Sequence, residues 1–107
     1  MICTCKRFTR GTTPSFTFDM SVHLDYVEEI NATFMQLDTV VLNKNKNDII
    51  VIDHDSIKIT LTEAETKLFS DKHDVQCQFR IKYNNGAVIT SEPPIIFKVD
   101  SMLYRGE

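Results

Sequence analysis

The sequence predicts an all-β fold, an antiparallel β-sandwich of about seven to nine short strands with one short helix. Two observations predict it. Apolar and polar residues alternate with a period of two along most of the chain, and clusters of Asn, Asp, Gly and Pro separate the alternating runs at short intervals. The chain has 107 residues, which is enough for a single domain, and we expect that domain to span residues 1–107.

The clearest strand is "VQCQFRIKY", residues 75–83. Its apolar residues all fall on one face of an extended chain, and Gln76, Gln78, Arg80 and Lys82 fall on the other. Asn84 and Asn85 tolerate a positive φ and Gly86 favours one, so we expect them to form a turn that returns the chain into a strand at "AVITS", residues 87–91. The two runs therefore predict a β-hairpin.

The remaining strands follow from the same alternation. An early strand carries Phe16 and Phe18 on one face. Further strands are predicted in two pairs and one final run: "INATFMQLD" with "TVVLNK", "DIIVID" with "SIKITL", and "IIFKV" after two prolines that end the preceding strand. The alternation assigns to the core Phe16, Phe18, Ile59, Leu61, Phe79, Ile81 and Phe97.

One segment departs from the strand pattern. In "LTEAETKLFS", Thr62 and Glu65 have the spacing of a capping box, in which the threonine begins a helix and the glutamate reaches back to it. Leu68 and Phe69 supply an apolar side. The sequence predicts a helix of about two turns near residues 62–69, crossing from one sheet to the other.

Composition and charge limit the classes of function. The net charge of −3 offers no basic face for nucleic acid, and no apolar run is long enough to span a membrane. The first ten residues do not resemble a secretion signal, and the three cysteines, Cys3, Cys5 and Cys77, are an odd number. We expect free thiols in a reducing compartment, with neither nucleic acid nor membrane as a partner.

The residues with catalytic or metal-binding chemistry are scattered. His23, His54 and His73 stand singly, and in an extended "DHD" segment the alternation would point His54 away from Asp53 and Asp55. A solvated turn is the interpretation we adopt for that segment. No serine or threonine lies in the sequence context of a nucleophile elbow, the strand-to-helix turn that carries a catalytic serine. The prediction is that the chain is not an enzyme and has no catalytic residue, no metal, no cofactor and no small-molecule substrate.

The stretch "RGTTPSFTF", residues 10–18, has a structural interpretation. Gly11 gives backbone freedom to a turn, Pro14 fixes φ and removes one donor, and the threonine hydroxyls can satisfy free backbone groups. We expect this stretch to shape the start of an edge strand.

The order of several motifs resembles a group of small phage and prophage proteins. "RGTTPSFTF" resembles the stretch that leads into the first strand of that group, and "TFMQLD", "IKITLTEAET" and "VQCQFRIKYNNG" follow in the same order. The likeness covers roughly residues 7–104. It implies an immunoglobulin-like sandwich encoded among phage structural genes, often near tail modules. The first residues here are more numerous than in that group, and the closing "DSMLYRGE" is more polar than a usual final strand.

The resemblance implies a non-catalytic structural protein of a tailed bacteriophage virion, made in the cytoplasm of the bacterial host and placed in the tail, baseplate or connector region. The alternatives are an auxiliary protein of the phage head, which decorates or cements the capsid, and a host adhesion or carbohydrate-binding sandwich. The partners implied are other phage structural proteins or further copies of this chain.

Two surfaces are candidates for docking a partner. Residues 1–8 can act as an extended arm that pairs with a neighbouring chain, with Ile2, Thr4, Lys6 and Phe8 along it, or they can pair within their own sheet. The polar strand face of Gln76, Gln78, Arg80 and Lys82 is either a second docking surface or a solvated face. Gly11, Pro14, Thr62, Glu65 and Gly86 are assigned structural roles.

Overall fold

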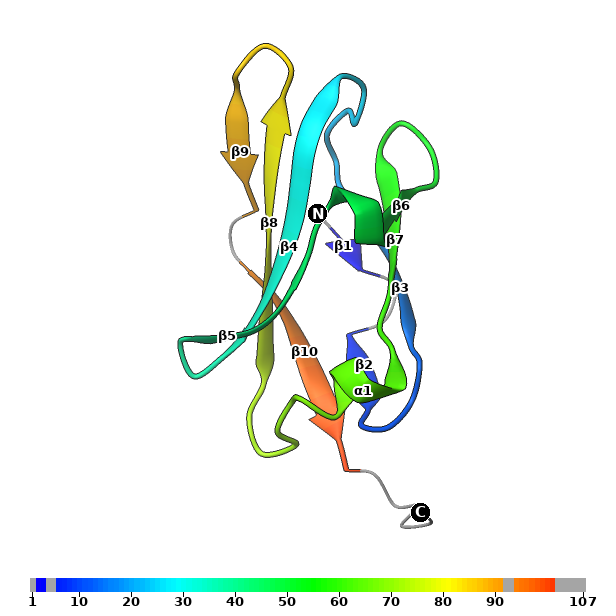
Figure 1. The fold of residues 1–107 in the computed structure, drawn as a ribbon, viewed down its shortest axis with the longest axis vertical. Coiled ribbons are helices and arrows are strands. Elements are labelled where there is room, and N and C mark those ends of the chain that lie inside the picture. Colours follow the sequence, from blue (N-terminus) through cyan, green and yellow to red (C-terminus); the bar gives the residue numbers. More distant parts are fainter. Residues whose placement is uncertain (1, 4–5, 92–93, 102–107) are drawn as a thin grey trace.

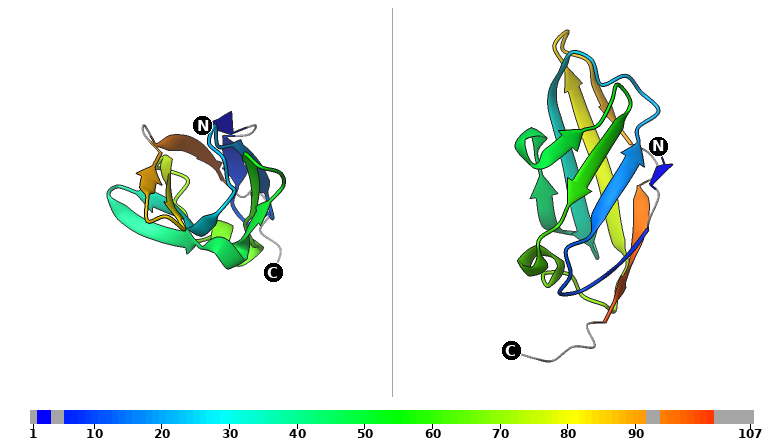
Figure 2. Two further views of the ribbon diagram at one scale, coloured as in Figure 1. Left: turned by 90° about the horizontal axis from the view of Figure 1, so that it is seen from above. Right: turned by 90° about the vertical axis from the view of Figure 1, so that its right-hand side faces the viewer.

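The computed structural model describes residues 2–3, 6–91 and 94–101. It shows a mostly-β protein in which two sheets face each other and one short α-helix lies at one end (Figure 1). Seen along the long axis, the two sheets curve around a common interior (Figure 2, left). The sandwich-like arrangement predicted from the alternation is therefore present.

The strands form a four-stranded and a six-stranded sheet. The smaller sheet contains, in spatial order, β1 (Ile2–Cys3), β3 (Ser15–Asp19), β7 (Ser56–Thr60) and β6 (Ile49–Val51). The larger sheet contains, in spatial order, β2 (Arg7–Thr9), β10 (Ile95–Asp100), β8 (Val75–Tyr83), β4 (Val27–Gln36) and β5 (Thr39–Lys44), and β9 (Val88–Thr90) also pairs with β8.

Two features of this topology correct the sequence prediction. The described residues form ten strands, against the seven to nine expected, because the start of the chain is divided between the sheets. In addition, β2 pairs with β10 in parallel, with Phe8 opposite Val99, so the larger sheet is mixed and not purely antiparallel. Alternation along a single strand carries no information about the direction of its neighbour, which is why the sequence could not show this.

The predicted hairpins are confirmed. β8 pairs with β9, β6 with β7, and β4 with β5, all antiparallel. The β4–β5 turn consists of Leu37 and Asp38, which have φ values of 50° and 63° between the paired residues Gln36 and Thr39. Positive φ at both central residues matches the twist of the two flanking strands. Gly86 has φ of 90° in the β8–β9 turn, as its predicted turn role requires.

The core lies between the sheets and contains all seven residues assigned to it from the sequence: Phe16, Phe18, Ile59, Leu61, Phe79, Ile81 and Phe97. Its centre is an aromatic cluster that joins the two layers. The ring centroids of Phe18 in β3 and Phe79 in β8 lie 4.9 Å apart, and those of Phe16 in β3 and Phe97 in β10 lie 4.8 Å apart, both edge to face. Edge-to-face pairs add stabilisation beyond the area that they bury.

The helix is shorter than predicted. α1 (Glu63–Thr66) is a single turn that begins at the predicted cap Thr62. After α1 the backbone hydrogen bonds reach back three residues instead of four. The N–H of Leu68 donates to the carbonyl of Glu65, and that of Phe69 donates to the carbonyl of Thr66. Phe69 is buried in the core, but Leu68 is exposed, so the two do not form one apolar helix side. A 3₁₀ turn, η1 (Lys46–Asp48), lies in the loop before β6.

Candidate functional site

The first residues of the chain pair within their own sheets. β1 pairs with β3, and β2 pairs with β10. Phe8 is only 4% exposed and its ring packs edge to face on Phe69 at 5.5 Å, so it belongs to the core. Of the two possibilities expected for residues 1–8, the described residues show pairing within their own sheets, and Phe8 is not exposed to a partner because its face of β2 points between the sheets.

The other residues of the predicted arm lie around Phe8. Ile2 is in β1, opposite Asp19 of β3, and Thr4 lies outside the described residues. Lys6 is exposed, and its carbonyl accepts a hydrogen bond from the backbone N–H of Lys98 at 2.8 Å. Of the four residues, Lys6 is the one whose side chain the structure describes on the surface.

The stretch that follows is attached to α1 through a buried threonine. The N–H of Gly11 donates to Oγ1 of Thr66 at 2.9 Å, and this hydroxyl also lies 3.1 Å from the carbonyl oxygen of Thr12. The carbonyl of Pro14 accepts the N–H of Leu61 at 3.0 Å, and Gly11 has φ of 79°. Gly11 and Pro14 therefore shape the crossing from β2 to β3. The expectation that this stretch leads into an edge strand is wrong, because β3 lies between β1 and β7. Sequence reasoning missed Thr66, because a threonine in a helical turn carries no signal of burial.

The polar face of β8 lies on the outer side of the larger sheet. Gln76 and Arg80 are exposed, and Gln78 and Lys82 are partly buried. Arg80 forms an ion pair with Glu29 and Lys82 with Glu28, each at 3.7 Å. Exposed pairs of this kind contribute little to stability. The four predicted residues thus share one open, charged surface with β4.

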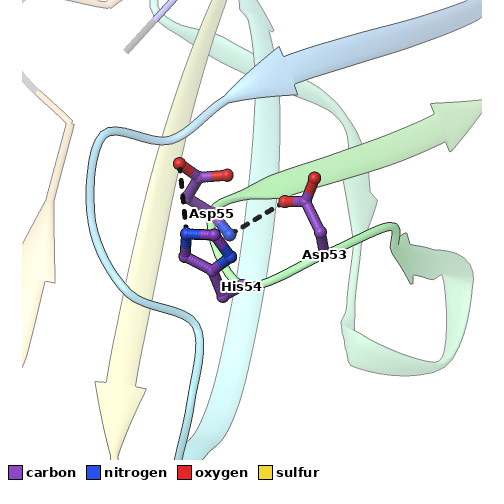
Figure 3. Close-up of side chains that lie close together, drawn as sticks. All are labelled: Asp53, His54 and Asp55. Atoms are coloured by element: carbon purple, nitrogen blue, oxygen red, sulfur yellow. Dashed lines mark hydrogen bonds and ion pairs between the residues drawn. The ribbon is translucent and has the colours of Figure 1, made fainter.

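The turn between β6 and β7 brings Asp53, His54 and Asp55 together (Figure 3). One ligand atom from each lies within 4.8 Å of the others, and Nε2 of His54 is 3.8 Å from Oδ2 of Asp55. The N–H of Asp55 donates to the Asp53 carboxylate at 3.1 Å, and this backbone hydrogen bond lowers the pKa of Asp53. The segment is a turn, as the sequence indicated, so the alternation that would point His54 away from both aspartates does not apply.

A second loop meets this turn. The N–H of Met20 donates to the carbonyl of Asp55 at 2.8 Å, and that of Leu24 to the carbonyl of His54 at 2.6 Å. These bonds bring His23 onto His54, with ring centroids 5.6 Å apart and planes 28° apart. The group offers imidazole and carboxylate donors, but its side chains are largely in solvent. The three residues of the turn and His23 thus form a solvent-exposed cluster on the surface.

A hollow of about 560 Å³ lies where β3 ends beside β8 and β10. Its walls are mainly apolar, with Met20, Ile81 and Ile95 among them, and Lys6 lies at its border. The sequence could not indicate it, because it forms between segments that are far apart along the chain.

The edge strand β6 exposes an unusual run of apolar side chains. Ile50, Val51 and the following Ile52 are 59%, 52% and 51% exposed. Val51 also lines a small hollow of about 160 Å³ with Leu24 and Tyr26, and Tyr26 is 81% exposed. Large apolar side chains gathered on an open sheet edge are typical of a protein–protein contact. The sequence predicted a strand here but not that it would lie at an edge.

None of the helices among the described residues is long and apolar enough to cross a membrane. Comparison with protein-family models, with characterised proteins and with solved structures finds no match to this chain.

Proposed function

We propose that this chain is a non-catalytic structural protein of a tailed bacteriophage virion. It is made in the bacterial cytoplasm and assembles through protein–protein contacts in the tail, baseplate or connector region. The finer description of the fold, an immunoglobulin-like sandwich, belongs to the same proposal. It is supported by the two facing sheets and by the order of the motifs along the chain.

The observation that carries the proposal is the pair of edge strands that follow one another in the chain. β5 is an edge of the larger sheet and β6 an edge of the smaller one, and both expose large apolar side chains, Val40 on β5 and Ile50 and Val51 on β6. An open edge presents unpaired backbone donors and acceptors, and apolar side chains beside them add buried area when a strand is added. The charged outer face of β8 and β4 offers a second surface.

The test is to purify phage particles from the bacterial strain that encodes the chain and to measure the protein by mass spectrometry. The proposal expects the protein in intact particles, at a copy number that matches the symmetry of the tail. A copy number that matches the capsid lattice would favour the head auxiliary role instead. Absence of the protein from particles that are complete and infectious would refute the virion assignment.

A further inference from the structure

Two histidines from separate segments meet beside the turn between β6 and β7. The ring centroids of His23 and His54 are 5.6 Å apart. An imidazole nitrogen binds zinc at about 2.0–2.1 Å, so the ring centres of two histidines on one ion lie roughly 5–6 Å apart. Both side chains are exposed, and each ring can present either of its nitrogens by rotating. The pair therefore has the separation that one shared ion requires.

Two aspartates of the turn add carboxylate donors. Ligand atoms of Asp53, His54 and Asp55 lie within 4.8 Å of one another, and Nε2 of His54 is 3.8 Å from Oδ2 of Asp55 (Figure 3). The donor atoms of a tetrahedral zinc site are about 3.3 Å apart, and rotations of these solvated side chains can close the remaining distance. Two carboxylates also balance the two positive charges of such an ion.

Hydrogen bonds orient each aspartate from the side away from its second oxygen. The N–H of Asp55 donates to Oδ1 of Asp53 at 3.1 Å, and the hydroxyl of Ser56 donates to Oδ1 of Asp55 at 3.3 Å. The Oδ2 atom of each carboxylate has lone pairs that can bind an ion. Metal-binding carboxylates are commonly held by hydrogen bonds of this kind.

The segment that carries His23 is fixed against the turn. The N–H of Leu24 donates to the carbonyl of His54 at 2.6 Å, and the carbonyl of His23 accepts the hydroxyl of Tyr83, in β8, at 2.8 Å. The backbone of both histidines is thus positioned before any ion binds. This lowers the entropic cost of bringing the donors together.

A hollow of about 180 Å³ lies between the two segments. It is lined by His23, His54 and Asp55, together with Ser21 and Val22. This is enough room for an ion and its waters, because one water occupies about 30 Å³ in the liquid. The donors from the two segments therefore border a common space.

We propose that His23, His54, Asp53 and Asp55 bind one Zn²⁺ ion, which joins the loop between β3 and β4 to the turn between β6 and β7. Mixed imidazole and carboxylate donors suit zinc and its neighbours in the first transition row, whereas Mg²⁺ and Ca²⁺ prefer oxygen ligands alone. Four protein ligands are typical of a structural zinc site.

The proposal departs from the expectation, drawn from the sequence, of a chain without a metal. That expectation assumed an extended segment in which His54 points away from both aspartates, and the turn removes this reason. The zinc site goes beyond the proposed virion role and does not depend on it.

Zinc titration of the purified chain tests the site. Cys3→Ser and Cys5→Ser are included, because thiolates also bind zinc. After dialysis against EDTA, calorimetry is expected to show one ion per chain, with a Kd of about 10 μM or below. The melting temperature should rise by about 5 °C at a zinc concentration ten times the Kd, and Mg²⁺ should leave it unchanged. A Kd weaker than about 1 mM, or an equal rise with Mg²⁺, would overturn the proposal.

His23→Ala and Asp53→Asn test the donors from the two segments. Asparagine keeps an oxygen that accepts the N–H of Asp55, but it has no negative charge. Each variant is expected to weaken zinc binding by about tenfold or more. His73→Ala, at the third exposed histidine, is the matched control and should bind as the wild type does. An unchanged affinity in His23→Ala, or an equal loss in His73→Ala, would contradict the shared site.

Imidazole ¹⁵N resonances give a readout that needs no substitution at the site. Addition of zinc is expected to shift the ring signals of His23 and His54 and to leave that of His73 in place. A shift at His54 alone would show an ion bound to the turn without the second segment, and the proposal would fail. Absence of the protein from phage particles would affect the virion assignment alone.

Discussion

Lys44 and Glu65 form an ion pair with an Nζ to Oε2 distance of 2.7 Å, which joins the end of β5 to the first turn of α1. Lys44 is almost fully buried, and Glu65 also accepts the backbone N–H of Thr62 at 2.8 Å in the capping box. One carboxylate therefore serves both the start of the helix and its attachment to the larger sheet. Sequence reasoning found the capping box but not its partner from β5.

This relationship predicts a pH dependence of stability. Burial by itself raises the pKa of Glu65, but the hydrogen bonds from Lys44 and Thr62 and the charge of Lys44 outweigh it, and the pKa is lowered. A lowered pKa in the folded state gives stability that is fully present above the pKa of the unfolded chain, about 4.3, and is lost as the pH falls through the folded value. Urea unfolding between pH 7 and pH 2 measures this loss.

The matched variant is Glu65→Gln, because glutamine keeps a hydrogen-bond acceptor in the capping box but does not titrate. Asp53 and Asp71 also have lowered pKa values, so the wild type and the variant both lose stability in acid. The expected result is a smaller acid loss in the variant. Identical pH profiles would show that the pair with Lys44 does not contribute.

Replacing Thr62 with Ala removes the cap of α1. Thr62 Oγ1 accepts the N–H of Glu65 at 3.1 Å, and the substitution leaves this donor without its partner. We expect a loss of about 1 kcal/mol in the free energy of unfolding, measured by urea denaturation. Thr62→Ser keeps the hydroxyl and should retain most of the stability; equal losses in the two variants would argue against the cap.

Replacing Thr66 with Val tests the attachment of residues 10–14. The Thr66 hydroxyl is fully buried and accepts the N–H of Gly11, so its removal leaves a polar backbone group unsatisfied. The expected loss is about 1–3 kcal/mol in the free energy of unfolding. Thr90→Val, on an exposed position of β9, is the control and should change stability by less than about 0.5 kcal/mol. Losses of the same size would contradict the attachment.

Phe8→Ala tests whether the start of the chain belongs to the core. Phe8 packs on Phe16 and Phe69, with ring centroids 5.9 Å and 5.5 Å away. Truncation of a buried phenylalanine costs about 3–5 kcal/mol, enough to unfold a marginal domain. Thermal melting should show a large decrease, and deletion of residues 1–8 should be at least as harmful. A variant that melts like the wild type would return these residues to the role of a free arm.

The alternation of side chains was sufficient to predict most strands and the core. In β8, every second residue from Val75 to Ile81 is buried, because a strand with one covered face requires this period. The capping box at Thr62 and the turn at Gly86 were equally predictable, since each depends on the conformational preferences of a few adjacent residues. These features are local, and local chemistry determines them.

The tertiary structure decided the features that depend on which distant segments meet. The division of the first residues into β1 and β2, the parallel pairing of β2 with β10 and the burial of Phe8 all depend on contacts with other strands, β3 for β1 and the distant β10 for β2. The stacking of His23 on His54 depends on contacts between separate loops. The position of Ile50 on an open sheet edge likewise depends on which strands pair with each other. The period of two specifies which face of a strand is apolar. Its neighbours depend on differences between pairing energies of similar size, and these differences take effect only when the whole chain folds.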